Sequence, residues 1–438
     1  MKKYILILSL FATATLRAQD DIYPAKPYKG KLFITGGTIH VGNGQVIEGG
    51  SIEVDNGKIV RVGAGLTPAG DAKVVDAKGK QIYPGLILPV TDLGLKEIGS
   101  GVRGSNDFQE ISDIDPSIRS IVAYNTDSKV INTLKANGIL LAGVTPQGGT
   151  ISGSSTVVQL DAWNWEDAAY KMDNAIHLNM PTFLVRPRRF GGGGGGRFAG
   201  LQTPTDPTKE ALAKVDEIKA FFREAKAYNA ETTHKQTNLK FEAVKGLFTK
   251  QQKLFVHGDQ IKQMLVAIDF AKEFGFDVTI VGGSESWLIA DLLKQNNISV
   301  ILQQLHALPT TEDDDVDQPF KTPAMLQKAG VLFALNDNHE ESRYRNLMFN
   351  AGTAVAYGLS KEQALQAITL NAAKICGIDD RTGSLEAGKD ANIVISGGDI
   401  LDMRTSLIEH CFIQGREVSL ENKQTQLYHR YMTKYGLQ

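Results

Sequence analysis

KLFVHGDQIKQMLVAIDFAKEFGFDVTIVGG, residues 253–283, is the stretch that decides the fold of this chain. Lys253–His257 and Phe276–Val281 are apolar runs typical of buried strands, and Gln260–Phe274 between them is rich in helix formers. The apolar residues of the middle segment recur at helical spacing, at Ile261, Leu265, Ile268 and Ala271. A strand, a helix and a second strand within about thirty residues predict a βαβ unit with parallel strands.

The same alternation of strands and helices extends in both directions. The other expected elements of this kind are Ile139–Thr145, Thr208–Thr232, Trp287–Gln295, Ile298–Leu302, Val331–Leu335, Asn350–Gly358 and Lys361–Ile375. Repeated units of this length predict a parallel sheet, either open or closed into a barrel. A β/α-barrel uses about 250 residues, which leaves room in a chain of 438 residues for a second unit.

Both ends of the chain are rich in expected strands. Leu32–Thr35, Ser51–Asp55 and Lys58–Val62 lie in the N-terminal part, and Asn56-Gly57 between the last two suits a tight hairpin turn. Ala391–Ser396 and His410–Ile413 are the corresponding runs near the C-terminus. The economical arrangement packs the two ends into one small β unit, with the α/β segment inserted between them.

The first residues have the pattern of an export signal. Lys2 and Lys3 provide the positive start, and Tyr4–Ala14 is an apolar run too short to span a bilayer. Cleavage after Ala18 predicts a signal peptide at residues 1–18 and a mature protein in the periplasm or outside the cell. The alternative is an uncleaved anchor. No later stretch approaches the length of a membrane span.

Composition and charge exclude further classes of protein. The hydrophobic fraction of 42% and the charged fraction of 22% are those of an ordinary globular protein. The net charge of −2 and the lack of clustered Lys and Arg argue against a nucleic-acid partner. Cys376 and Cys411 can form one disulfide in an oxidising compartment, but two buried thiols are the preferred interpretation.

Blocks of sequence at both ends carry a family resemblance. ITGGTI (34–39), GKI (57–59) and IYPGLI (82–87) lie in the N-terminal part, and NAA (371–373) and GSLEAGKDANIV (383–394) lie in the C-terminal part. In these blocks the chain resembles the amidohydrolase superfamily, in its imidazolonepropionase-like branch. The resemblance covers nearly all of the chain after the export signal, and the last block is the most specific.

The resemblance implies an α/β fold. Residues 84–379 would form a (β/α)8 TIM-like barrel, and a small composite β-sandwich would form from the N- and C-terminal segments, 31–83 and 380–420, leaving 421–438 as a tail. The site would lie at the C-terminal ends of the barrel strands. The ligand would be a small molecule, and the chain would form a homo-oligomer or pair with an intact amidohydrolase.

The chemistry of the family uses one or two divalent metal ions, Zn or similar, which lower the pKa of bound water. The first barrel strand should end in His-x-His, but Val90 and Asp92 occupy those positions. His257 fits the ligand position on the middle strand, whereas Gly282 replaces the His of the next strand. A binuclear site is therefore not expected. Asp92 remains a candidate ligand, although a capping carboxylate is the preferred interpretation.

The last barrel strand should supply an Asp that binds metal or acts as a general base. Asp337 or Asn338 occupies that position, depending on a slip of one residue. A rearranged single-metal site, with Asp337 as its catalytic residue, would draw on Asp92, His257, His306, Asp337 and His339. Chance also gathers such residues at a barrel mouth, where the loops are polar. The remaining candidates are expected on the surface or in structural roles: His177, His234, His410 and His429.

Four unusual segments allow two interpretations each. Thr145–Ser155 could present backbone N–H groups to an anion or be a long mouth loop. Trp163–Asp167 could line a ligand site, but anchors for a loop are preferred. Gly191–Gly196, beside several Arg residues, could be a lid, but a disordered surface insertion is preferred. Asp313–Asp315 is expected to be a solvated acidic loop rather than a cation site.

Two functions follow. The first is an enzyme that hydrolyses a non-peptide C–N bond of an amide or cyclic amide by a metal-activated water, with a depleted metal site. The second is a catalytically inactive homologue that binds a ligand or serves as partner of an intact relative. His257 and the remaining acids favour the first, and Val90 and Gly282 favour the second.

Overall fold

The computed structural model describes the chain from residue 22 to residue 437 with gaps. The described residues are 22–97, 109, 112–183, 206–231, 233–303, 305–309, 313–337 and 343–437. The expected signal peptide at 1–18 lies outside these residues, so export remains a prediction. The Gly191–Gly196 run also lies outside them. Within them, no helix is long and apolar enough to cross a membrane.

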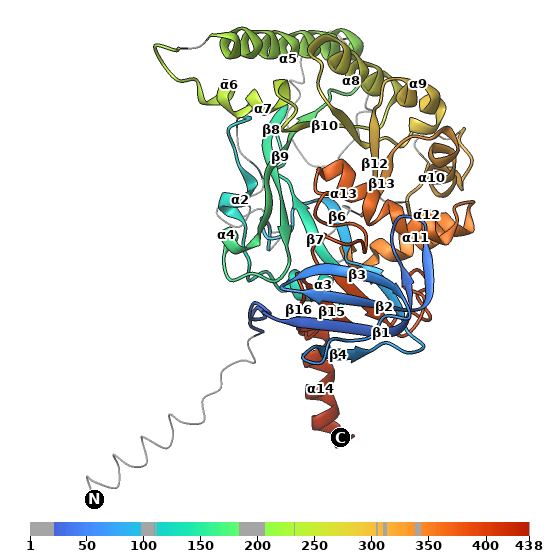
Figure 1. Ribbon diagram of the computed structural model, residues 1–438. Coiled ribbons are helices and arrows are strands. Elements are labelled where there is room, and N and C mark those ends of the chain that lie inside the picture. The colour runs from blue at the N-terminus through green and yellow to red at the C-terminus, as the bar shows by residue number, and fades with distance from the viewer. Residues whose placement is uncertain are drawn as a thin grey trace, which may run out of the picture.

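Eight strands form a nearly closed barrel, which confirms the predicted fold class (Figure 1). In their order around the sheet they are β6 (Leu86–Thr91), β7 (Ile139–Val144), β8 (Ile151–Gln159), β9 (Ala169–Asn179), β10 (Lys253–Gly258), β11 (Val278–Gly282), β12 (Ser299–Gln303) and β13 (Phe333–Asn336). The side chain of Asn336 spans the gap between β13 and β6. Its Nδ2 donates to the carbonyl of Val90 at 2.9 Å, and its Oδ1 accepts from the backbone N of Val90 at 3.3 Å.

One part of the barrel departs from the regular parallel pattern. β8 runs antiparallel to both β7 and β9, so a β-hairpin stands where a helical crossover was expected. The prediction that Thr145–Ser155 is wholly a loop is therefore wrong, because β8 begins at Ile151 and all nine of its residues are buried. Its serines suit this buried strand because they have partners: Ser155 Oγ donates to Asn174 at 3.0 Å.

Helices cover the barrel and lie mainly after the parallel strands. They are α2 (Ser120–Ala123), α3 (Lys129–Lys135), α4 (Trp165–Ala168), α5 (Pro207–Ala230), α6 (Leu239–Ala243), α7 (Lys245–Phe248), α8 (Ile261–Phe274), α9 (Ala290–Gln295), α10 (Gln318–Ala329), α11 (Leu347–Ala356), α12 (Lys361–Ala367) and α13 (Leu370–Cys376), with short 3-10 turns at Ser286–Ile289 and Tyr344–Asn346. The helix expected at Gln260–Phe274 is confirmed, with a reciprocal cap at Gln260 and left-handed Gly275 at its end.

A second eight-stranded sheet joins the two ends of the chain, as predicted. Its strands are β1 (Lys31–His40), β2 (Val46–Asp55), β3 (Lys58–Ala64), β4 (Lys73–Asp76), β5 (Gln81–Pro84), β14 (Ile393–Ser396), β15 (Ile408–Ile413) and β16 (Arg416–Glu417). β5 pairs with β14 across more than 300 residues of sequence, and this sheet encloses a hydrophobic core separate from that of the barrel. The chain ends in α14 (Lys423–Tyr435), which projects from the body (Figure 1).

The two cysteines do not pair. Cys376 and Cys411 are both buried free thiols, so the preferred interpretation is confirmed. Burial raises the pKa of Cys376 to about 12, which keeps this thiol protonated and unreactive.

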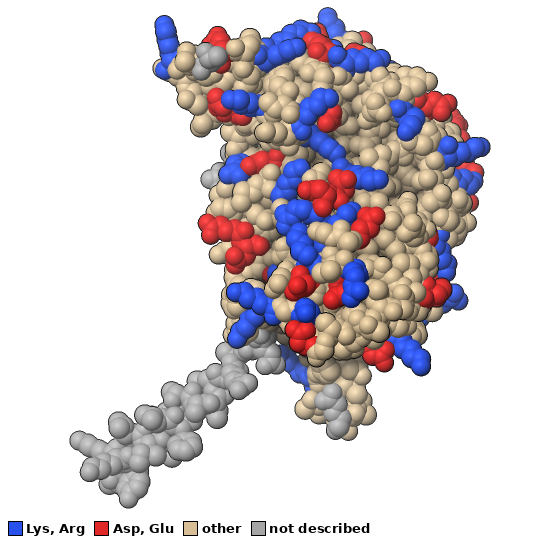
Figure 2. All heavy atoms as spheres, viewed as in Figure 1, with Lys and Arg blue, Asp and Glu red and all other residues tan. Residues whose placement is uncertain are grey.

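The surface charge agrees with the near-neutral net charge of the sequence, because Lys and Arg are interspersed with Asp and Glu over the face that Figure 2 shows.

Candidate ligand site at the barrel mouth

The candidate residues lie on one rim of the barrel because parallel strands end on the same side. His257 is the last residue but one of β10, and Gly282 is the last residue of β11. Asp92 directly follows β6, and Asp337 directly follows β13. Each of these residues therefore lies at the end of a barrel strand or directly after it.

His257 meets His177, which the sequence analysis did not connect with the site. Nδ1 of His177 lies 2.8 Å from Nε2 of His257, and the two rings are 5.2 Å apart between centroids. His177 stands on β9, beside β10, and its side chain is fully buried, so the surface interpretation of His177 is wrong. The only local signal was its place in a short apolar run, Ala175–Leu178.

Burial keeps both imidazoles neutral. It lowers the pKa of His257 to about 4, and it lowers that of His177 well below the usual value, with the nearby His257 adding to the effect. One ring therefore donates to the other, and Nε2 of His257 is occupied by this hydrogen bond. Nε2 of His177 is buried and has no partner among the described residues.

The first-strand positions offer little to a metal ion. Val90 is a buried hydrocarbon side chain and has no donor atom. Asp92 is also buried, and its Oδ1 accepts a short hydrogen bond from the hydroxyl of Tyr344. Burial and then the charge of Asp92 raise the pKa of Tyr344, so this phenol stays a donor. Asp92 thus serves as a buried acceptor.

Gly282 leaves its strand end without a side chain, and the surroundings leave no space for one. Its φ of +108° disfavours any residue other than glycine. A Cβ built there would lie 2.7 Å from Oδ1 of Asp259 and 3.1 Å from the carbonyl oxygen of Gly258. The backbone conformation at Gly282 therefore disfavours a His at this position.

The remaining predicted ligands are held apart by other partners. Asp337 is buried, and its Oδ2 accepts from Nδ2 of Asn350 at 3.0 Å. His306 lies 2.8 Å from the hydroxyl of Thr353, and its ring packs edge-on against Phe320. His339 lies outside the described residues. In the described part of the chain, no three His, Cys, Asp or Glu side chains gather around a point where one ion could contact them.

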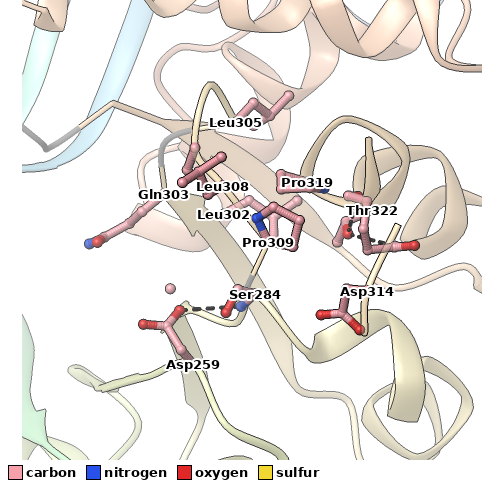
Figure 3. A pocket seen from close by; sticks show the side chains of 13 residues that line it. Asp259, Ser284, Leu302, Gln303, Leu305, Leu308, Pro309, Asp314, Pro319 and Thr322 are labelled. Atoms are coloured by element: carbon pink, nitrogen blue, oxygen red, sulfur yellow. Dashed lines mark hydrogen bonds between the residues drawn. The ribbon is translucent and has the colours of Figure 1, made fainter. Parts of the chain in front are cut away.

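A cavity of about 250 Å³ opens beside these residues, at the ends of β10, β11 and β12 (Figure 3). Its apolar wall comes from Leu302 and the Leu305–Pro309 segment, and its polar groups come from Asp259, Ser284, Asp314 and α10. Figure 3 shows Asp259 beside Ser284, whose backbone N donates to Oδ1 of Asp259 at 3.2 Å, with Asp314 across the pocket.

The charge of this pocket is one-sided. Two carboxylates, Asp259 and Asp314, line it, and no Lys, Arg or His is among its lining residues. The sequence predicts a solvated acidic loop at Asp313–Asp315. Asp315 pairs with Lys321, whereas Asp314 lines the pocket. Asp314 lines the same pocket as Leu302 and Gln303 of β12 only in the folded chain, and no local sequence pattern indicates this proximity.

The comparisons with known proteins agree with this architecture. The family described as the amidohydrolase family matches residues 213–418. A solved structure, an amidohydrolase from Thermotoga maritima, is 25% identical with a TM-score of 0.74, over 89% of this chain and 99% of that one. The chain belongs to the amidohydrolase superfamily. An imidazolonepropionase of Mesorhizobium japonicum is 25% identical over 74% of this chain and 79% of its own length, which supports the imidazolonepropionase-like branch.

The matches to two other relatives of this amidohydrolase-superfamily chain span only part of those proteins. The amidohydrolase TasK of Hapsidospora irregularis is 21% identical over 77% of this chain, and the match spans only 36% of TasK. The match to the imidazolonepropionase of Picrophilus torridus spans 42% of that protein. This chain therefore covers less than half of the length of these two curated relatives.

The metal ion that this superfamily uses does not fit the residues present here. Val90 and Gly282 supply no ligand atom, Gly282 cannot be given a side chain without moving Asp259, and Nε2 of His257 is bonded to His177. Metal affinity depends on the number and geometry of donors, and the described residues provide neither.

The aromatic segment Trp163–Asp167 noted in the sequence lies outside this pocket. Trp163 is largely exposed and stacks on Tyr23 with ring centroids 5.9 Å apart. Trp165 begins α4, whose N-cap Asn164 accepts from the backbone N of Asp167 at 2.8 Å. Neither Trp lines the pocket at the barrel mouth.

Proposed function

We propose that this amidohydrolase homologue binds a small molecule at the barrel mouth without hydrolysing it by a metal-activated water. The observation that carries the proposal is the strand-end geometry: Gly282 cannot accept a side chain, and His257 is bonded to His177. Val90 is the second altered position after Gly282, so two of the donors that would activate water are replaced by residues without a ligand atom.

The pocket supports a particular class of ligand. Asp259 and Asp314 line a cavity that has no basic residue among the described ones, and the rest of its wall mixes apolar side chains with those of Ser284, Gln303, Gln318 and Thr322. A carboxylate pair of this kind attracts an ammonium or guanidinium group, most strongly where the wall excludes water. The volume of about 250 Å³ is below the usual range for drug-sized ligands, which favours a compact amine with a short apolar body.

Hydrolysis of an amide or cyclic amide remains the second candidate. It is favoured by His257, which stands at the strand end where the family resemblance places a ligand. The export of the chain, its formation of a homo-oligomer and its pairing with an intact amidohydrolase are further proposals. Pairing would be measured by sedimentation of the purified chain alone and mixed with an intact amidohydrolase from the same cell.

Turnover separates the two candidate functions. Purified protein supplied with zinc is expected to hydrolyse no cyclic imide, hydantoin or dipeptide above the rate of buffer with zinc. The reason is that the strand ends lack a complete donor set for a reactive metal-bound water. Zinc-dependent turnover that disappears in His257→Ala would establish hydrolysis and reject the proposal.

Binding tests the ligand class. Butylamine and butylguanidine are expected to bind in calorimetric titrations, whereas butanol and butyrate are not. Asp259→Asn and Asp314→Asn should each weaken amine binding about tenfold, because each removes one charged hydrogen-bond acceptor. Asp313→Asn is the matched control, since Asp313 is exposed and does not line the pocket. Equal weakening by Asp313→Asn, or a preference for butyrate, would show that this pocket is not an amine site.

A further inference from the structure

The last helix of the chain, α14 (Lys423–Tyr435), has an amphipathic sequence, and most of its residues are exposed. None of its residues is buried. Its start is well fixed, because the side chain of Asn422 accepts hydrogen bonds from the backbone N of Gln424 and Thr425, and Thr133 of α3 donates to Gln424 at 3.2 Å. Beyond this first turn the helix projects from the terminal sheet (Figure 1).

Three tyrosines form a stripe along the projecting part. Tyr428, Tyr431 and Tyr435 follow the i, i+3, i+7 spacing that places side chains on one helix face. Their side chains are 59%, 51% and 64% exposed, respectively, and Leu437 beyond them is 66% exposed. The side of this projection seen in Figure 2 is almost free of charged residues. A contiguous exposed aromatic stripe of this kind marks an interaction surface.

A second stripe of the same helix is positively charged. Lys423, Arg430 and Lys434 are spaced by seven and four residues, so they also share one face, and all three are exposed. No Asp or Glu occurs from residue 423 to residue 437. The two stripes adjoin, because Nζ of Lys434 lies 5.7 Å and 5.3 Å from the ring centroids of Tyr431 and Tyr435.

We propose that α14 docks on the surface of an anionic lipid bilayer. Tyrosine has an apolar ring and a polar tip, which suit the layer between headgroups and acyl chains. The adjoining cations would lie against the lipid phosphates, and each basic residue near an anionic membrane adds attraction. Thirteen residues are too few to cross a bilayer, so the helix would lie in the plane of the surface.

The observations favour lipid over a second copy of this chain. The exposed stripe is made of tyrosines, and the apolar side chains beside it in the helix, Leu427 and Met432, are half-buried, which leaves no exposed aliphatic seam within α14 for a second helix. Two such helices packed face to face would also bring their basic stripes close together, and neither helix carries an acid to offset the repulsion. A negatively charged lipid surface does not need an aliphatic seam on the helix, and it attracts the basic stripe.

The test uses the full chain and co-sedimentation with vesicles. One set of vesicles is phosphatidylcholine, and the other is phosphatidylcholine mixed with phosphatidylglycerol. Three cations, at about fivefold each, predict about a hundredfold stronger partitioning to the anionic vesicles at low salt. The variant Lys423→Gln/Arg430→Gln/Lys434→Gln should lose this preference. Tyr428→Ser/Tyr431→Ser/Tyr435→Ser should retain a salt-sensitive preference but bind less to both vesicles.

A matched control separates the helix from overall charge. Lys226→Gln/Lys262→Gln/Lys272→Gln makes the same change in net charge at exposed positions on α5 and α8, and it should partition like the unchanged protein. All substitutions are at unburied residues, so thermal melts should coincide. Equal binding to both vesicle types, or equal loss in the control, would overturn the proposal. So would sedimentation showing a dimer that the tyrosine variant dissociates, because the occupant would then be a second copy.

Discussion

Asp161→Asn is expected to lower the free energy of unfolding by about 3 to 5 kcal/mol, because it leaves a buried ammonium group without its counter-ion. Nζ of Lys135 lies 2.8 Å from Oδ1 of Asp161, and the two side chains are only 3% and 1% exposed. Arg416 of β16 also approaches Asp161, at 3.4 Å. The carboxylate thus joins the end of α3, the segment after β8 and the terminal sheet, so its charge holds the two units together.

Equilibrium unfolding in urea measures this effect. The matched control is Asp127→Asn, because Asp127 pairs with Lys129 at 3.5 Å but its side chain is 90% exposed. An exposed pair of this kind contributes about 0 to 1 kcal/mol. If the two variants lose similar stability, Asp161 does not act as the buried counter-ion described here.

Gly143→Ala should cost about 3 kcal/mol or more, because the added methyl group has no room. A Cβ on Gly143, in β7, would lie 2.0 Å from the carbonyl oxygen of Pro89 in β6. Backbone atoms on a barrel strand cannot move aside as a flexible side chain can, and the β6–β7 register is already irregular between Leu88 and Thr91. The substitution would therefore push β6 outward at the residue before Val90.

The control for this prediction is Gly63→Ala in β3. Gly63 has nothing within 4 Å of a built Cβ, and its φ is not positive. Its replacement should change the free energy of unfolding by less than about 1 kcal/mol, because only the entropy of the unfolded chain changes. Urea unfolding of both variants checks the contrast, and a small effect at Gly143 would mean that the β6–β7 backbone can separate.

Sequence patterns predicted the elements whose signals are local. α8 was predicted to within one residue, because its apolar spacing, its capping residues and Gly275 all lie within the segment itself. The β8–β9 hairpin was missed because a strand with both faces buried has no alternating pattern, and β8 satisfies its burial with serines and a glycine that resemble a loop. The antiparallel direction of β8 has no local signal at all.

Some features of the candidate site were likewise visible in the sequence, and others required the tertiary structure. The replacement of ligands by Val90 and Gly282 was visible from the sequence. That Gly282 disfavours any side chain follows from its φ of +108° and from Asp259, which occupies the space directly after the neighbouring strand β10. The contact of His257 with His177 joins residues 80 positions apart, and it required knowing that β9 lies beside β10. Asp314 likewise reaches the pocket through tertiary folding.

Zinc stoichiometry tests the central claim most directly. The purified protein would be incubated with excess zinc at neutral pH, passed through a desalting column and measured by mass spectrometry of the metal, beside His257→Ala. The account predicts far less than one zinc per chain in both proteins, because Nε2 of His257 is bonded to His177 and Val90 and Gly282 supply no ligand atom. One or two retained zinc ions per chain, lost in His257→Ala, would contradict it.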